Sequence, residues 1–229
     1  FFDIEFPPVD AVIGNPPYVR RMYLDSIDQL RESVFSDNTM NYGLQLSRLT
    51  DLYVYFLLRA CKFLKPAGRL AVVVADSWLN VGYGHELKNY LKEFYNIEKI
   101  ISFDQNFFGA EVKPVILLAT KKLSITKNET HLVNFIRIKN GDSIDILKQS
   151  IQQLQNHKNV TISLPKQVEL ETSKPWSIYF KTPELYDFLA SHELMSSFSE
   201  QGRTRLGIQT LAKEFFVFTS PDATALKIE

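Results

Sequence analysis

Apolar runs and amphipathic stretches alternate along the first 122 residues of the chain. Residues 9–14 form a short, mostly apolar run, which is typical of a strand in a parallel sheet. Residues 47–64 place apolar side chains at helical spacing, with Asp51 near the start and Lys62 near the end, as the helix dipole favours. Further strands are expected at 70–75, 97–103 and 112–122, and a helix at 85–94. The pattern predicts an α/β fold with a doubly wound parallel sheet, which can end in an antiparallel pair of strands.

The places where the predicted strands begin and end indicate where a ligand would bind in such a sheet. Pro66 and Gly68 predict a turn that ends the helix before the strand at 70–75. Asn15 and Asp76 each follow directly on a predicted strand. Because ligands of open α/β sheets bind at the carboxyl ends of the strands, we expect these two residues to lie beside a ligand site.

The pattern of polar and apolar residues changes after residue 122, and this change predicts three regions, 1–125, 126–195 and 196–229. The middle region is more polar, with an Asn-Gly turn and predicted helices at 143–156 and 182–191, and we expect it to be an insertion or linker. The last region, with the run "GIQTLAKEFFVF", is typical of the opening of a β-rich unit.

Composition excludes several classes of protein. Lys and Arg together number 26, as do Asp and Glu, so the net charge is zero and nucleic-acid binding would need a local patch. The one cysteine, Cys61, and four scattered histidines indicate neither a disulfide framework nor a metal site. No run is long enough for a membrane span, and no signal peptide is apparent, so a cytoplasmic location is expected. The chain does not begin with Met, and we expect it to be a fragment of a longer protein.

The stretch "VDAVIGNPPY" ends the first strand in a stiff, polar turn. An amino group attached to an aromatic ring is a poor nucleophile, because its lone pair is delocalised into the ring. The side-chain oxygen of Asn15 and the carbonyl of Pro16 could accept the two N–H bonds of such an amine, and the prolines would hold them in place. Tyr18 offers a face on which a base can stack. The alternative is a plain strand-ending turn.

The same stretch resembles motif IV of the N6-adenine DNA methyltransferases, the Asn-Pro-Pro-Tyr class, with flanks like those of type IIG and TaqI-like enzymes. "DLYVYFLLRACKFLKPAGRLAVVVADSWL" is similar to motifs V and VI, and "FDQNFFGAEVKPVILLATKK" to motif VIII. The resemblance implies that residues 1–125 are the catalytic half of a Rossmann-like methyltransferase domain. It also implies that 196–229 begin a target-recognition domain.

The resemblance assigns roles to individual residues. Asn15, Pro16 and Tyr18 would hold and activate the amine, and Phe108 would stack on the other face of a flipped adenine, with Phe107 as the alternative. These two phenylalanines could equally be core aromatics. Residues lining the pocket of S-adenosylmethionine would be Asn15, Asp51, Leu52 and Tyr53. The last three could as well be one face of an amphipathic helix.

Duplex DNA is the partner that the resemblance implies. Phosphates near the cleft could be contacted by Arg20, Arg21, Lys121 and Lys122, which could also be ordinary solvated surface. The family's Gly-rich cofactor loop is not present in the chain, so we expect the chain alone to bind the cofactor weakly and to be inactive.

Other functions share the motif. Methyltransferases that act on RNA or on glutamine side chains of proteins use similar planar-amide chemistry. A catalytically silent DNA-binding module is a second alternative. The oligomeric state is not indicated by the sequence.

Overall fold

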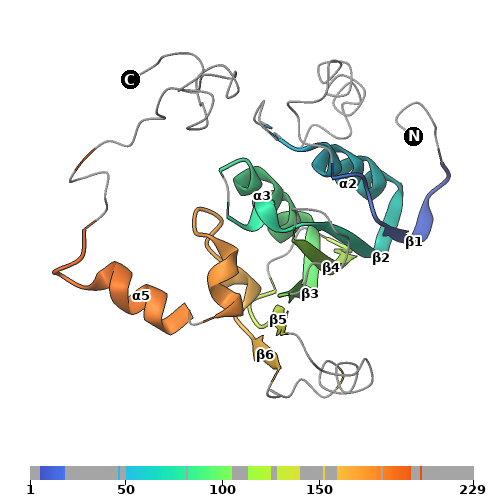
Figure 1. Cartoon of the computed structure of the whole chain (residues 1–229). Coiled ribbons are helices and arrows are strands. Elements are labelled where there is room, and N and C mark those ends of the chain that lie inside the picture. Colours follow the sequence, from blue (N-terminus) through green and yellow to red (C-terminus); the bar gives the residue numbers. More distant parts are fainter. Residues whose placement is uncertain are drawn as a thin grey trace, which may run out of the picture. The chain divides into compact units, whose positions relative to one another are not determined.

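The described part of the chain contains a six-stranded mixed sheet with helices packed on it (Figure 1). The computed structural model describes residues 6–18, 46, 50–80, 82–104, 113–124, 128–139, 152, 159–181, 183–196 and 202. The strands are β1 (Val9–Gly14), β2 (Leu64–Ala75), β3 (Tyr95–Phe103), β4 (Pro114–Lys121), β5 (Asn134–Ile138) and β6 (Val160–Ser163). The chain divides into two compact units, Phe1–Glu184 and Leu185–Glu229, and the sheet belongs to the first.

The strand order is β1-β2-β4-β3-β5-β6, and it confirms the predicted α/β sheet. β1 is parallel to β2, and β3 is parallel to β5. β4 is antiparallel to both of its neighbours, β2 and β3, so the expected antiparallel pair exists but lies inside the sheet. β3 therefore runs in the same direction as β2, one strand further along. β1, β2 and β3 all end at one edge of the sheet, which we call the carboxyl edge.

The main core lies between the sheet and two helices, α2 (Leu52–Phe63) and α3 (Gly84–Phe94). Trp78, in the short helix η3 (Asp76–Leu79), packs edge-to-face on Trp176, with ring centroids 5.8 Å apart. Both indoles are fully buried. A smaller cluster on β3, β5 and β6 is built from alternate residues of those strands, and it includes Ile101 and Ile136. Since successive side chains of a strand point to opposite faces, the sheet is buried on both faces there.

The turn expected at Pro66 and Gly68 lies within β2 and not between the helix and the strand. β2 begins at Leu64, directly after α2, and residues 65–68 form an irregularity within the strand. Ala67 has a φ of 62°, in the left-handed region. A Cβ on Gly68 would come within 2.8 Å of the Lys65 carbonyl oxygen, so the main chain approaches too closely here for a side chain.

The middle region, expected to be an insertion or linker, contributes β5 and β6 to the same sheet. It also contains the short helices η4 (Gln167–Glu169) and η5 (Trp176–Phe180) and the helix α5 (Pro183–Ser191), which agrees with the helix expected at 182–191. β5 was not foreseen from the sequence. Apart from Gln152, the helix expected at 143–156 lies outside the described residues, as does the β-rich opening after residue 202.

Candidate active site

The Asn-Pro-Pro-Tyr turn lies at the carboxyl edge, immediately after β1. The Tyr18 hydroxyl donates to Asn15 Oδ1 at 2.6 Å, and its oxygen also lies 3.2 Å from the carbonyl oxygen of Val73 in β2. Asn15 is exposed, whereas Tyr18 and Pro16 are half-buried. Burial raises the pKa of the Tyr18 phenol, so the hydroxyl keeps its proton and can donate. The Asn15 amide is therefore exposed to solvent, and its oxygen accepts a hydrogen bond from the half-buried Tyr18.

A second polar cluster joins the start of α2 to the residues that follow β2. The Tyr83 hydroxyl donates to Asp51 Oδ2 at 2.6 Å, and Ser77 Oγ lies 2.6 Å from that hydroxyl. Tyr53 adds its own hydroxyl, 3.1 Å from Ser77 Oγ and 3.3 Å from the Tyr83 oxygen. Asp51 occupies the N-cap position of α2, yet its side chain does not cap the helix. Its carboxylate accepts hydrogen bonds from Tyr83 and Ser77 instead.

Burial and the Asp51 carboxylate raise the pKa of Tyr83 to about 12. The pKa of Tyr53 also lies well above the usual value, mainly because the residue is buried. Both phenols are therefore neutral donors at physiological pH. Tyr83 can hold the Asp51 carboxylate directly without adding charge, and Tyr53 supports it through Ser77 and Tyr83.

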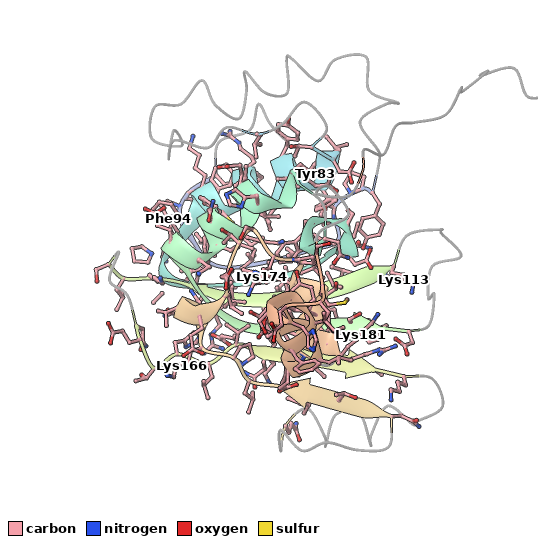
Figure 2. The ribbon with its side chains drawn as sticks, turned by 90° about the vertical axis from the view of Figure 1, so that its left-hand side faces the viewer. Tyr83, Phe94, Lys113, Lys166, Lys174 and Lys181 are labelled. Atoms are coloured by element: carbon pink, nitrogen blue, oxygen red, sulfur yellow. The ribbon has the colours of Figure 1, made fainter. Side chains whose placement is uncertain are left out.

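The two polar groups share the carboxyl edge because β1 and β2 are parallel neighbours. Ser77 lies two residues beyond the end of β2, and the Asp76 amide donates to the Lys113 carbonyl at 2.9 Å, where β4 begins. Burial raises the pKa of Asp76, although the positive charge of Lys113 opposes this. Figure 2 shows Lys113 towards one end of the strands and Phe94 and Lys166 towards the other.

The structure brings together some of the residues expected at the site. Asn15, Pro16 and Tyr18 form one group and Asp51 belongs to the second, both at the carboxyl edge. The side chains of Leu52 and Tyr53 are 8% and 0% exposed, so they line the core. The residues expected to stack on the base, Phe108 or Phe107, lie outside the described residues, as do Arg20 and Arg21.

Lys121 and Lys122 are not brought to the site. Lys121 ends β4 and Lys122 follows it, at the edge of the sheet opposite Asn15. Counted in strand residues of about 3.3 Å each, they lie about 20 Å from Asn15. The Lys121 ammonium donates to the carbonyls of Cys61 and Leu64, at 3.3 and 2.7 Å, at the end of α2. The Lys122 ammonium donates to the Lys92 carbonyl at 2.8 Å, near the end of α3. Each lysine thus places its charge at the carboxyl end of a helix, where the helix dipole favours a cation.

Sequence reasoning missed Ser77 and Tyr83. Ser77 follows a strand end, a position that could have singled it out. Tyr83 stands in the Gly-Tyr-Gly turn, which is typical of the beginning of a helix. Nothing local indicates that its hydroxyl reaches a carboxylate 32 positions earlier in the chain.

Within the described ranges, no three His, Cys, Asp or Glu side chains are grouped so as to hold a metal ion. No helix in the part of the chain that the structure describes is long and apolar enough to cross a membrane.

The first part of the chain is similar to a known protein family. Residues 3–108 match the model of the Eco57I restriction-modification methylase family. This segment, just under half of the chain, is similar to the methylase domain of that family. The matched segment contains the Asn15–Tyr18 turn, Asp51, Ser77 and Tyr83, so both polar groups of the carboxyl edge lie within the Eco57I-type segment.

Curated relatives extend the likeness. The type II methyltransferase M.BanIII of Aneurinibacillus aneurinilyticus is 33% identical over 132 residues, covering 57% of this chain and 21% of the relative. The type II methyltransferase M.AccI of Acinetobacter calcoaceticus is 25% identical over 222 residues, covering 96% of this chain and 38% of the relative. The chain thus spans well under half the length of these two relatives.

Solved structures show the same fold. The type IIG restriction endonuclease BpuSI superposes with a TM-score of 0.58 at 16% identity, covering 75% of this chain and 21% of that one. The methyltransferase subunit of a type I restriction-modification system from Streptococcus thermophilus gives a TM-score of 0.54 at 18% identity, with coverages of 79% and 41%. The methyltransferase fold expected for the Eco57I-type segment is confirmed.

Proposed function

We propose that this protein transfers a methyl group from S-adenosylmethionine to the N6 amino group of a flipped adenine in duplex DNA, as part of a restriction-modification system. The observation that carries the proposal is the Asn15 amide, exposed at the carboxyl edge with its oxygen held by Tyr18. The names of the relatives support the reaction class and the system. Adenine N6 is an aromatic amine with two N–H bonds, which a pair of fixed acceptors suits.

The Asn15 side-chain oxygen and the Pro16 carbonyl would accept the two N–H bonds of the amine. Two such acceptors draw the lone pair out of the ring and direct it at the methyl carbon. The new C–N bond would replace the C–S bond of the methyl donor, and the electron pair of that bond would remain on sulfur. Asn15 and Pro16 continue to hold the N–H bonds of the cationic product until water removes the surplus proton.

S-adenosylmethionine, when bound, supplies a methyl group on a positively charged sulfur. The donor set of the carboxyl edge fits a cationic ligand, because it contains the carboxylate of Asp51 and the amide oxygen of Asn15. Asp51 is held by Tyr83 and Ser77, and these hydrogen bonds would orient it toward the cofactor. The buried Leu52 and Tyr53 would act through packing and through the hydroxyl cluster.

The remaining site assignments are part of the same proposal. Tyr18 and Phe108 would stack on opposite faces of the flipped base. Arg20 and Arg21 would contact DNA phosphates, and residues 196–229 would begin the domain that selects the sequence. We do not include Lys121 and Lys122 as DNA contacts, because their ammonium groups are bonded at the opposite edge.

The test is methyl transfer by the full-length protein from a tritiated donor. Duplex DNA, single-stranded RNA and a glutamine-containing protein substrate are offered separately, and labelled duplex DNA is digested to nucleosides. We expect label in N6-methyladenine from duplex DNA. Label in methylcytosine, in RNA or in protein would overturn the proposed substrate, and absence of transfer to all of them would favour the silent DNA-binding module.

A further inference from the structure

The Tyr18 hydroxyl has two acceptors and one proton. Its oxygen lies 2.6 Å from Asn15 Oδ1 and 3.2 Å from the Val73 carbonyl oxygen. The shorter contact is the stronger hydrogen bond. Val73 lies inside the sheet, where its neighbour Val72 is paired with Gly14 and Val73 itself with Ile116. The phenol therefore connects the exposed Asn15 side chain to a fixed point of the sheet.

The orientation of an asparagine amide decides whether it attracts or repels an amine. One end of the amide is an acceptor and the other carries two N–H donors, and the terminal torsion is broad and roughly two-fold. An unrestrained Asn15 would present N–H groups to the substrate amine part of the time. The hydrogen bond from Tyr18 uses one lone pair of Oδ1 and leaves the second for the substrate.

We propose that the Tyr18 hydroxyl is a positioning group that sets the Asn15 amide with its oxygen toward the substrate amine. This role differs from base stacking, which belongs to the ring and needs no hydroxyl. The inference rests on the proposed function, since it assigns the hydroxyl a part in that reaction. With the amide flipped, Nδ2 would face the phenol oxygen, which could then only accept from it, and the hydroxyl would have to donate along the longer contact with Val73. The flipped amide would be disfavoured, because the short O–H···O bond of 2.6 Å would be replaced by a donation over 3.2 Å.

Tyr18→Phe is the direct test, because it removes the hydroxyl and retains the ring. In the full-length protein we expect kcat for adenine methylation to fall about fivefold to tenfold, the loss of one neutral hydrogen bond, with KM for DNA unchanged. A rise in kcat would mean that the hydroxyl competes with the substrate for Oδ1. An effect on KM alone would place the hydroxyl in DNA binding. Either result overturns the inference.

Asn15→Asp supplies the matched background for a double-mutant cycle. A carboxylate accepts at both ends, so its orientation needs no control. We expect Tyr18→Phe to change kcat less than about twofold when it is combined with Asn15→Asp. An equal loss in both backgrounds would show that the hydroxyl acts on something other than the amide.

A readout without turnover separates this inference from the proposed function. In protein labelled with ¹⁵N-asparagine, the Asn15 side-chain amide is assigned by its absence in Asn15→Asp. We expect its heteronuclear NOE to drop in Tyr18→Phe, because the amide gains freedom to rotate. An unchanged NOE would overturn the inference even if the wild-type protein methylates adenine. If the NOE drops but no adenine is methylated, the proposed function fails and the amide–phenol contact stands.

Discussion

Lys88 of α3 has its ammonium group inside the protein, and replacing it should change how stability depends on pH. The residue is only 2% exposed. Its Nζ donates to the Lys174 carbonyl at 2.9 Å and lies 5.6 Å from the ring centroid of Trp176. Figure 2 labels Lys174. Burial lowers the pKa of Lys88 to about 8, because the charged amine loses most of its hydration.

The sign follows from proton binding in the two states. Below pH 8 both the folded and the unfolded lysine are protonated, while between pH 8 and 10.5 the unfolded lysine holds a proton that the folded one has released. Stability contributed by this group therefore rises with pH across that window. From pH 7 to pH 9.5 the gain is about 2 kcal/mol, at 1.36 kcal/mol per pKa unit. The carbonyl and the indole favour the charged amine, so this figure is an upper value.

Lys88→Met keeps the length of the side chain and removes the titration. The measurement is the free energy of unfolding by urea, at several pH values from 7 to 9.5, for both proteins. We expect the stability of the wild type relative to Lys88→Met to rise by up to about 2 kcal/mol. The difference cancels other titrations, including that of Cys61, whose pKa burial raises to about 11. Lys166→Met, at an exposed position, is the control, and a pH-independent difference for Lys88→Met would refute the reasoning.

Two further predictions concern the framework of the site. Gln167→Leu should lower the free energy of unfolding by about 2–4 kcal/mol. The Gln167 side-chain amide pairs with main-chain groups at the start of β3, and these groups would be left buried and unpaired. Urea titration measures the loss, and a value below about 0.5 kcal/mol would contradict this prediction. Gly84→Ala should destabilise by about 3 kcal/mol, since its Cβ would lie 1.8 Å from the Trp78 carbonyl oxygen, whereas Gly82→Ala meets nothing within 4 Å. Equal melting temperatures for the two alanine variants would be inconsistent with that contact.

The predictable part of the fold came from patterns that are local in the chain. The apolar run of β1 and the amphipathic stripe of α3 each reveal their element within about ten residues. The position of β4 between β2 and β3 was not predictable in this way, because strand order depends on contacts between distant segments. β5 was missed since its polar surroundings hid a run of only five residues.

In the candidate site, too, local features were predictable and contacts between distant residues were not. The Asn15 turn was found because one motif holds both acceptors and the ring. The Asp51–Tyr83 contact joins residues 32 positions apart, and no periodicity shows it. Lys121 and Lys122 were singled out as candidate phosphate contacts for a related reason. Their charges are visible in the sequence, but the helix carbonyls that accept from them are not.

Asn15→Ala in the full-length protein tests the central claim most directly. Transfer of tritium to adenine in duplex DNA is measured beside the wild type and beside Asn96→Ala, an asparagine near the opposite edge of the sheet. We predict that Asn15→Ala lowers the rate at least about 100-fold while the melting temperature is retained, as for the loss of one preorganised group in an active site. Near-normal labelling by a folded Asn15→Ala protein would contradict the account.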